Sequence, residues 1–523
     1  MKNSKTLSEM YSKVMTCILV VFYGLLLLPS MLSGQTAKIE DILTIRLSDS
    51  GPLKSGQDVK GYYFVYETAS SNKDQNTYDL RIHDLNLNLL KKKKISVPKT
   101  YALETVLYNG RSIAVKFFDA KELHYVFKGY TLEGELIFTK ETLKISKYEN
   151  YKNSTSSDEF PSFYSIPQFG YMNYTMTKDK GEKLGYNINF YSDNASVPHW
   201  TFNSTSDKFE TANHLAADST LAYFSIMKRD GAMSTDVSIF LVAFSSKTGK
   251  MAFEIPLVGK EYKYLAFSSF ISSSGNIHLM GRYYGLKDNV LKDKGLGLSL
   301  LEIDRTGKIV NATHIPADDK RLIGSSASSG EDKTDKSTYF YFHDFINLED
   351  GRVIGIAESY SLKVNVLGLA GNLYGLGTSG GNIVIEDMYI FEFNKEFELQ
   401  NIKRFDKYKS NFALPGIPIA SPVLYSYYVK ERGGFDYQFY QKNSDNTTAG
   451  IYFLNYERRK DAANNMVLGA IFASKDGYTT DKFDLSKKAD DTNIFQGAFG
   501  SVVIMDYYRK LKSLNVQIVK LNF

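Results

Sequence analysis

Cysteine is almost absent from this sequence, and no charge sign dominates it. The 523 residues contain one cysteine, Cys17, with 11 prolines and one tryptophan. A single thiol excludes a disulfide-scaffolded fold. The 63 Lys and Arg against 58 Asp and Glu leave a net charge of only +5. This balance excludes a highly charged tail protein and provides no basic footprint for nucleic acid.

Long hydrophobic runs are also missing after the first 30 residues. The apolar run 17–28 has 12 residues, which is too short for a membrane-spanning helix. It follows a basic segment that contains Lys2, Lys5 and Lys13, and Pro29 ends it. This order is typical of a secretory signal peptide. We therefore predict a signal peptide over residues 1–35, with cleavage near Gln35; an uncleaved N-terminal anchor is the alternative.

The remaining residues, 36–523, contain no cysteine and no segment of 18 apolar residues. They should therefore not cross a membrane as a helix. A large exported chain without thiols is typical of bacteria rather than eukaryotes, whose secreted domains usually carry disulfides. We expect a secreted, periplasmic or cell-envelope protein of a bacterium.

Helical patterns are scarce, and strand patterns are common. Short runs rich in Val, Ile, Phe, Tyr and Thr alternate with clusters of Gly, Asn, Asp, Ser and Lys. Apolar stripes with the helical period are hard to find, and only the Ala-rich stretch 211–217 suggests a helical turn. The sequence therefore predicts an all-β fold.

A weak internal repeat defines the unit of this fold. Residues 270–284 and 345–360 each have Phe-Ile, a turn glycine and a β-branched residue two positions later. Each is followed by a second similar segment, at 300–304 and at 390–394. Two strands joined by a Gly turn, then two more joined by an Asp- or Asn-led turn, make a four-stranded unit. Units of this size are typical of propeller blades.

Counting such units predicts a β-propeller of about seven blades, with six or eight as close alternatives. Two tandem β-sandwich domains are the competing interpretation, because they also have short strands and frequent turns. In the propeller, residues 36–523 form one domain, and the last strand pair, 501–521, completes the first blade and closes the ring. Residues 361–381 form an insertion, either a hairpin flap on the neighbouring blade or a contact loop for a partner or the envelope.

The motifs that carry the repeat also resemble a known group of proteins. The signal peptide, the thiol-free Tyr- and Lys-rich body, and the segments 270–284 and 300–310 look like a family of uncharacterised secreted bacterial proteins with a propeller-like β domain. This resemblance covers most of residues 36–523. It implies the fold and an exported location, and it implies no activity and no functional residues.

Two glycine motifs suggest chemistry that their surroundings do not support. Residues 375–380 fit G-x-G-x-x-G, and Ser379 sits in a G-x-S-x-G pattern at 377–381. Both motifs need a helix directly afterwards, to receive a pyrophosphate or to expose a nucleophilic serine. The next residues, 382–386, are strand-like. We therefore predict a flexible glycine loop, no dinucleotide cofactor and no catalytic serine.

The histidines, carboxylates and lysines of the sequence form no recognisable catalytic or metal-binding motif. The seven histidines lack H-x-H and H-E-x-x-H spacing, although a ring could gather several at its axis. Glu302 and Glu392 occupy equivalent repeat positions, which favours a structural role. The run Lys91–Lys94 is interpreted as a solvated strand end rather than a polyanion site. The sequence therefore predicts no catalytic, cofactor-binding or metal-binding residues.

Aromatic residues are the largest surplus, at 14% of the chain. Exposed tyrosine suits sugar or peptide recognition, but most of these residues are expected to pack between blades. Three functions remain open. The first is a non-enzymatic module that binds an extracellular protein or polysaccharide. The second is a propeller-type glycosidase or lyase, which would need two carboxylates about 5–10 Å apart. The third is a structural envelope component that uses residues 361–381.

Overall fold

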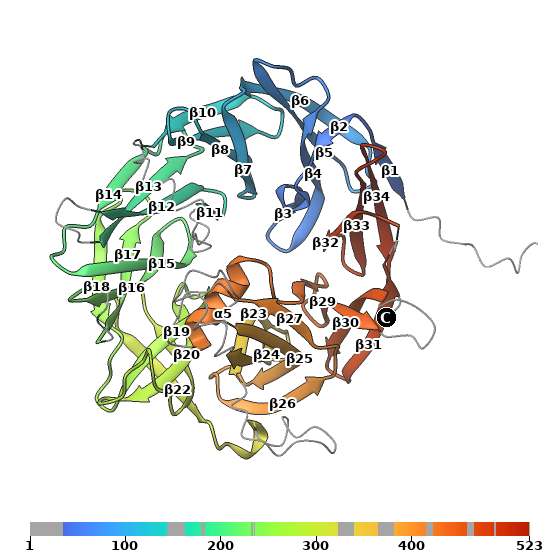
Figure 1. Ribbon diagram of the computed structural model, residues 1–523. Coiled ribbons are helices and arrows are strands. Elements are labelled where there is room, and N and C mark those ends of the chain that lie inside the picture. Colours follow the sequence, from blue (N-terminus) through green and yellow to red (C-terminus); the bar gives the residue numbers. More distant parts are fainter. Residues whose placement is uncertain are drawn as a thin grey trace, which may run out of the picture.

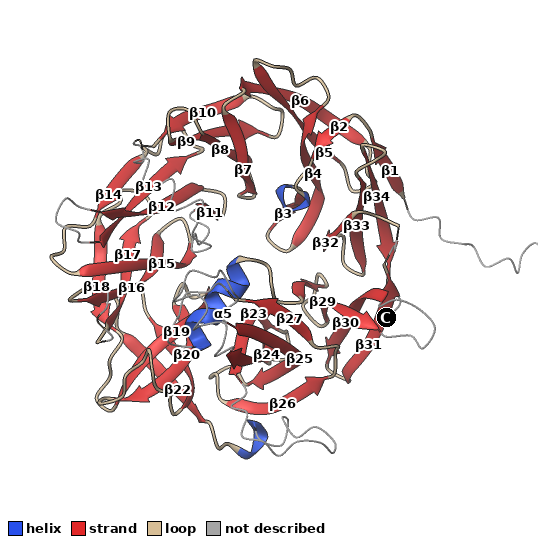
Figure 2. Ribbon diagram, viewed as in Figure 1, coloured by secondary structure: helices blue, strands red, loops and turns tan. Residues whose placement is uncertain are grey.

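The computed structural model describes residues 35–142, 144, 163–178, 184–231, 234, 236–322, 339–364, 381–414, 422–457, 465–485 and 488–521. These residues form mostly β-strands (Figure 2). The α-helix α5 (Pro422–Glu431) and the 3₁₀ helix η1 (Leu47–Asp49) lie among the strands. No helix of the described segments is both long and apolar enough to span a bilayer.

The strands form eight separate antiparallel sheets, arranged as the blades of a ring (Figure 1). The all-β prediction and the propeller are confirmed, and tandem sandwiches are excluded. The blade count of seven was wrong, and the alternative of eight is correct. Faint repeats cannot be counted reliably from sequence, because loops and bulges change their spacing. The Ala-rich stretch 211–217 is also a strand rather than a helical turn.

The first four blades follow the chain in order. Blade 1 contains β2 (Ile42–Thr44), β3 (Gly51–Ser55), β4 (Asp58–Thr68), β5 (Gln75–His83) and β6 (Leu89–Pro98). Blade 2 contains β7 (Tyr101–Tyr108), β8 (Ser112–Asp119), β9 (His124–Thr131) and β10 (Leu136–Glu141). Blade 3 contains β11 (Phe163–Ile166), β12 (Gly170–Lys178), β13 (Leu184–Ser192) and β14 (Trp200–Asn203). Blade 4 contains β15 (Phe209–Ala217), β16 (Leu221–Arg229), β17 (Ser238–Ser245) and β18 (Met251–Pro256).

The other four blades complete the circle. Blade 5 contains β19 (Tyr262–Ile271), β20 (Ile277–Gly285), β21 (Gly297–Ile303) and β22 (Ile309–Pro316). Blade 6 contains β23 (Tyr339–Asn347), β24 (Val353–Val364), β25 (Gly381–Phe393), β26 (Leu399–Phe405) and β27 (Ser410–Ala413). Blade 7 contains β28 (Tyr437–Lys442), β29 (Ala449–Glu457), β30 (Asn465–Ser474) and β31 (Gly477–Asp484). Blade 8 contains β32 (Asp491–Gln496), β33 (Ser501–Tyr508), β34 (Ser513–Lys520) and β1 (Thr36–Ile39).

The ring is closed by a strand from the N-terminal side of the chain. β1 pairs antiparallel with β34, so that Thr36 lies opposite Gln517 and Ile39 opposite Leu514. The segment 501–521 therefore belongs to blade 8, which β1 completes; it does not complete the first blade as the sequence predicted. The prediction that strands from the two ends of the chain close the ring is confirmed. The prediction that the last strand pair completes the first blade was wrong, because β1 instead completes the last blade. β1 lies at the rim of its blade, while β32 lies toward the centre (Figure 1).

Apolar side chains join each blade to the next. Seven buried clusters cover all eight boundaries, because the largest one extends over blades 4, 5 and 6. Between blades 2 and 3, for example, the rings of Phe127 and Tyr191 lie 4.6 Å apart. Each buried aromatic contributes about 1.5–3 kcal/mol through the surface removed from water. The alternating strand residues therefore supply the stability of the ring, one boundary at a time.

The repeat identified in the sequence corresponds to equivalent strand pairs of blades 5 and 6. Residues 270–284 cover the turn from β19 to β20, and residues 345–360 cover the turn from β23 to β24. Gly275 and Gly351 occupy these turns with φ of 87° and 85°. Only glycine adopts this conformation at no steric cost, which explains why the turn glycine recurs.

Two segments extend into the centre of the ring. The hairpin between β3 and β4 reaches from blade 1 to blades 7 and 8: Gln57 Nε2 donates to Tyr440 Oη at 3.0 Å, and Gln496 Nε2 donates to the Gln57 carbonyl at 3.1 Å. Helix α5 lies at the central side of blade 6 (Figure 1), and its Tyr427 hydroxyl donates to the Ala266 carbonyl of blade 5. These contacts join blade 1 to blades 7 and 8, and α5 to blade 5, at the inner side of the ring.

Candidate functional site

The structure gathers no metal site among the residues that it describes. In these segments no group of three or more His, Cys, Asp or Glu side chains is placed to hold a metal ion. The seven histidines are distributed over blades 1 to 6 instead of meeting at the axis; they are His83, His124, His199, His214, His278, His314 and His343. Residues 375–380, with Ser379, lie outside the described residues, as do residues 1–34 and most of the insertion 361–381.

Several of the histidines are held neutral by burial. Burial lowers the pKa of His214, His278 and His343 to about 4. His278 on β20 is 1% exposed, and its ring stacks on Phe270 with centroids 4.6 Å apart. Its Nε2 atom lies 4.0 Å from Glu302 Oε1, which partly opposes the effect of burial on the pKa of His278. These histidines pack between aromatic rings and offer no free general base.

The substitution His278→Phe is expected to reduce the acid sensitivity of the protein. Because the folded pKa of His278 is about 4 and the unfolded one about 6.5, the folded state binds fewer protons between these values. The free energy of unfolding therefore decreases as the pH falls from 6.5 toward 4. One histidine with this lowered pKa accounts for a decrease of up to about 3 kcal/mol. Urea unfolding midpoints between pH 7 and pH 4 measure this slope. If the midpoint of the variant depended on pH as steeply as that of the unmodified protein, the lowered pKa of His278 would be contradicted.

A buried group of ionisable side chains lies between blades 6 and 7, around Lys407. Lys407 Nζ lies 3.3 Å from Glu358 Oε1 and 2.5 Å from Asp436 Oδ2. Glu358 on β24 also accepts hydrogen bonds from the backbone N–H groups of Asp436 and Tyr437, at 3.3 and 3.0 Å. Its Oε2 atom lies 3.0 Å from His343 Nε2. We call these four side chains, His343, Glu358, Lys407 and Asp436, the interblade charge network.

A β-bulge places His343 in this network. The register of β23 against β24 shifts between Phe342 and Asp344, so His343 is the extra residue. A bulge redirects the side chain that it carries. Lys430 Nζ of α5 lies 3.4 Å from His343 Nδ1. Since an ammonium group can only donate, Nδ1 is the acceptor and Nε2 carries the ring hydrogen; Nε2 lies close to Glu358 but is not aligned for a hydrogen bond with it.

The charges of the network stabilise one another. Burial alone would raise the pKa of Glu358, but Lys407 and His343 lower it to about 2. Burial opposes the charge on Lys407, and Glu358 and Asp436 nevertheless raise the pKa of Lys407 above its usual value. Burial raises the pKa of Asp436. The network therefore holds an ionised glutamate and a protonated lysine in the interior.

This network is closed to a substrate. The side chains of His343, Glu358 and Lys407 have no exposed surface. A catalytic acid or base must come within hydrogen-bond reach of the substrate. The geometry instead fixes the segment that leads into β28 of blade 7 against β24 of blade 6. We interpret the network as a structural connection between two blades.

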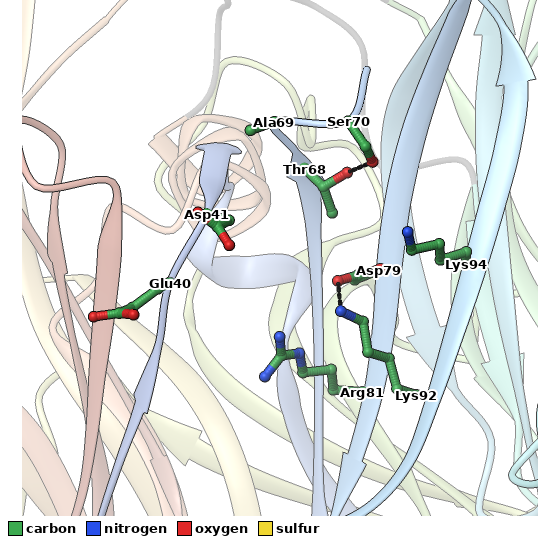
Figure 3. Close-up of a pocket in the computed structure, with 9 residues that line it drawn as sticks. All are labelled: Glu40, Asp41, Thr68, Ala69, Ser70, Asp79, Arg81, Lys92 and Lys94. Carbon is green, nitrogen blue, oxygen red and sulfur yellow. Dashed lines mark hydrogen bonds and ion pairs between the residues drawn. The ribbon is translucent and has the colours of Figure 1, made fainter.

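A cavity lined mainly by charged and hydroxyl-bearing residues lies at the rim, where β1 crosses into blade 1 (Figure 3). Its volume is about 190 Å³. The residues that line it are Glu40, Asp41, Thr68, Ala69, Ser70, Asp79, Arg81, Lys92 and Lys94. They come from the β1–β2 connection, the end of β4, and the paired strands β5 and β6. Eight of the nine carry a charge or a hydroxyl group, so we call this hollow the rim cavity.

Some charges of the rim cavity are already paired within the chain. Asp79 Oδ2 lies 2.8 Å from Lys92 Nζ and accepts the hydroxyl hydrogen of Tyr66 at 3.1 Å. Glu40 Oε1 lies 2.5 Å from Lys38 Nζ, and Lys38 lowers the pKa of Glu40. Two buried polar atoms, Asp79 Oδ1 and Arg81 Nε, have no hydrogen-bond partner in the part of the chain that the structure describes. Such atoms are costly to leave unpaired.

The lysine run contributes to this cavity, which the sequence did not predict. Residues 91–94 lie within β6, the outermost strand of blade 1, and not at a strand end. Lys92 lies opposite Arg81, and Lys94 lies opposite Asp79. Because successive strand residues face opposite sides, Lys91 and Lys93 belong to the other face. Lysines on an edge strand also oppose pairing with another sheet, which is a structural reason for the run.

Two other groups of residues named in the sequence have structural surroundings. Glu302 on β21 accepts a hydrogen bond from Asn276 Nδ2 at 2.7 Å, and Glu392 on β25 accepts one from Tyr478 Oη at 2.6 Å. These contacts support the structural role predicted for the two glutamates. No tyrosine of the described segments is exposed. The tyrosine surplus therefore packs mostly within and between the blades.

These observations define a closed eight-bladed β-propeller with a charged interblade connection and a polar cavity at its rim. The sequence pattern of the family of unknown function DUF6770 matches residues 10–522. The chain belongs to this family. The resemblance to an uncharacterised family with a propeller-like domain is thus confirmed. The sequence matches none of the curated proteins.

Known structures resemble the chain only distantly. The WD40 domain of SCAP from fission yeast has 9% identity and a TM-score of 0.36, covering 90% of this chain and 97% of that one. The propeller domain of the Trilobed protease from Pyrococcus furiosus has 11% identity and a TM-score of 0.32, with 72% and 98% covered. A PL25 polysaccharide lyase, described as an ulvan lyase, has 8% identity and a TM-score of 0.38, with 80% and 91% covered. None of these similarities bears on the function of this chain.

Proposed function

We propose that this protein is an exported, non-catalytic propeller that binds an extracellular glycan or protein partner at the rim cavity. In this proposal residues 1–35 are the signal peptide, residues 36–523 act as one domain, and the host is a bacterium. One observation carries the proposal. The rim cavity combines cations, carboxylates and hydroxyls around a hollow, whereas the interblade charge network is buried. Polar groups in a concave site are what fixes a ligand's orientation.

The proposal predicts that the double variant Arg81→Ala/Lys94→Ala loses partner binding while the fold is retained. Both side chains line the cavity, and neither forms an ion pair inside the described part of the chain. A glycan array that contains neutral and acidic polysaccharides, together with a bacterial envelope-protein array, measures binding. We expect at least one bound partner whose signal falls about tenfold or more in the variant, which corresponds to about 1.4 kcal/mol.

A matched control exists on the same strand. The variant Lys91→Ala/Lys93→Ala removes the same charge from the opposite face of β6 and should leave binding within about twofold. Thermal melting of both variants shows whether the ring is intact. Equal losses of binding in the two variants, with intact melting, would refute the rim cavity as the site.

A glycosidase or lyase remains the second candidate, because three carboxylates line the same cavity: Glu40, Asp41 and Asp79. Two features favour binding over acid catalysis. Lys38 lowers the pKa of Glu40, whereas a general acid needs a raised one. Asp79 is already engaged by Lys92 and Tyr66. Reducing-end and unsaturated-product assays on the polysaccharides of the array distinguish the two functions, since measurable turnover would establish an enzyme.

A further inference from the structure

The interblade charge network brings one amine and two carboxylates together in the interior. Lys407 Nζ lies 2.5 Å from Asp436 Oδ2 and 3.3 Å from Glu358 Oε1. The side chains of Lys407 and Glu358 have no exposed surface, and that of Asp436 is 9% exposed. Because these groups are closed to an external substrate, the reactants within their reach are one another.

The amine of Lys407 is close enough to the carboxyl carbon of Asp436 to attack it. A carbon–oxygen double bond is about 1.2 Å long, so a nitrogen 2.5 Å from Oδ2 lies at most about 3.7 Å from Cγ. Reacting atoms in a near-attack arrangement are about 3–3.5 Å apart. Ser410 Oγ also donates to Asp436 Oδ2 at 2.7 Å, which helps to orient the carboxyl group. The contact therefore approaches the geometry of acyl transfer to an amine.

The two carboxylates have different electrostatic surroundings, which suit them to different roles. Burial raises the pKa of Asp436, so this carboxyl group takes up a proton more readily than an exposed aspartate. Burial opposes the charge on Glu358, but Lys407 and His343 lower the pKa of Glu358 to about 2. A protonated carboxyl group is an electrophile, whereas an ionised one can accept a proton and return it. Asp436 is therefore suited to be the acyl donor, and Glu358 the proton carrier.

We propose that Lys407 and Asp436 form an intramolecular isopeptide bond, and that Glu358 is the catalytic residue that relays the proton. The Lys407 ammonium group gives one proton to Asp436 Oδ2, which leaves a neutral amine and a carboxylic acid. The amine nitrogen attacks Cγ, and Glu358 takes a proton from this nitrogen and passes it to the Oδ2 hydroxyl. The Cγ–Oδ2 bond then breaks and one water molecule leaves. The product is an amide, Glu358 returns to its carboxylate form, and no external reactant is consumed.

Formation of the bond removes two charges from the interior. An ammonium group and a carboxylate carry a large desolvation penalty even as a pair, whereas an amide is neutral. Exclusion of water also protects the product from hydrolysis. The bond joins the connection between β26 and β27 of blade 6 to the segment before β28 of blade 7. It provides a covalent connection between blades in residues 36–523, which contain no cysteine.

Lys228 offers an internal comparison, because it also lies between two carboxylates. Its Nζ atom lies 2.7 Å from Glu254 Oε1 and 3.2 Å from Glu210 Oε1. The side chains of Lys228 and Glu254 are 19% and 27% exposed, so that water reaches this ion pair. Solvation keeps both charges in place and disfavours the neutral amine and acid that the reaction needs. We therefore expect Lys228 to remain a free amine in the same preparation.

Mass spectrometry of the denatured full chain tests the bond. The intact mass should be lower, by one water molecule, than the mass calculated for the sequence of the purified chain. Trypsin does not cleave after an acylated lysine, so digestion should release a branched peptide that joins residues 405–409 to residues 433–442. Fragmentation should place the branch at Lys407 and Asp436. The peptides that end at or follow Lys228 should have their calculated masses.

Two conservative variants separate the bond from the ion pairs. Lys407→Arg keeps the positive charge but has no nucleophilic amine, so it should retain its full calculated mass. Glu358→Gln keeps the shape of the side chain but cannot carry the proton, and the yield of the branched peptide should fall at least about tenfold. Circular dichroism shows whether each variant keeps the β fold. The readout is mass because loss of the ion pairs and loss of the bond both lower stability.

A full calculated mass for the unsubstituted protein, with no peptide joining 405–409 to 433–442, refutes the bond whatever the variants show. A missing water molecule located at other residues refutes it as well. A branched peptide that persists at full yield in folded Glu358→Gln overturns the relay role of Glu358. The rim cavity takes no part in this reaction, so the array experiment decides the proposed function separately.

Discussion

Replacement of Lys407 by methionine is expected to lower the free energy of unfolding by about 3–5 kcal/mol. Methionine fills similar space, so the loss arises from charge rather than from a cavity. Without the ammonium group, Glu358 and Asp436 become buried carboxylates with no cation between them. Removal of one partner from a buried ion pair is costly because the other partner remains desolvated. The midpoint of urea unfolding, followed by tyrosine fluorescence, measures the effect.

Lys409 offers a matched control two residues further along the chain. Its side chain is 63% exposed, and its Nζ atom lies 3.1 Å from Glu386 Oε1. Exposed ion pairs contribute about 0–1 kcal/mol, so Lys409→Met should shift the midpoint only slightly. Similar losses in the two variants would contradict the interpretation of the network as a buried connection. The triple variant Lys407→Met/Glu358→Gln/Asp436→Asn should be more stable than Lys407→Met, because it also removes the uncompensated charges.

Truncation of Ile39 to alanine is expected to cost about 2–5 kcal/mol and to weaken the closure of the ring. Ile39 is 1% exposed and lies opposite Leu514, in the cluster that joins blade 8 to blade 1. Its loss leaves a cavity beside the pairing of β1 with β34, where the two ends of the ring are held by hydrogen bonds and side-chain packing rather than by a covalent connection. Hydrogen exchange should therefore accelerate first in β1 and β34. The peptides that cover residues 36–39 and 513–520 report this change by mass spectrometry.

Thr36 provides the control within the same strand, because its side chain is exposed. Thr36→Ala should change the unfolding midpoint by less than about 0.5 kcal/mol and leave exchange in β34 unchanged. Uniform acceleration in all blades of Ile39→Ala would indicate a general loss of stability. That result would contradict a local role of β1 as the closing strand.

The sequence was most informative where local chemistry decides the structure. The turn glycines Gly275 and Gly351 need a left-handed backbone, so their recurrence in the sequence identifies the two equivalent strand pairs. The alternation of apolar residues identified strands, and the near absence of helical stripes excluded a helical fold. The number of blades was predicted wrongly because blades 1 and 6 carry extra strands, β3 and β27, which interrupt the regular pattern of four strands per blade.

The sites were less accessible to sequence analysis than the fold. His343, Glu358, Lys407 and Asp436 span more than 90 residues and show no common spacing. Their contact depends on a bulge in β23 and on the packing of blade 7 against blade 6. The signal for the rim cavity was present in Lys91–Lys94 but was assigned to a solvated strand end. The pairing of β6 with β5 places Lys92 opposite Arg81. As a result Lys92 and Lys94, two of the four lysines, line the cavity.

The sequence by itself determined the all-β character, the four-stranded unit and the position of its turns, because these depend on residues close together in the chain. Only the tertiary structure decided that eight blades close through β1, which ionisable groups are buried, and where charges gather around a hollow. These properties depend on contacts between residues far apart in the chain, and their spacing in the sequence follows no rule. Desolvation then sets the role of each group, since a lysine at the rim stays available to a ligand while Lys407 in the interior must be paired.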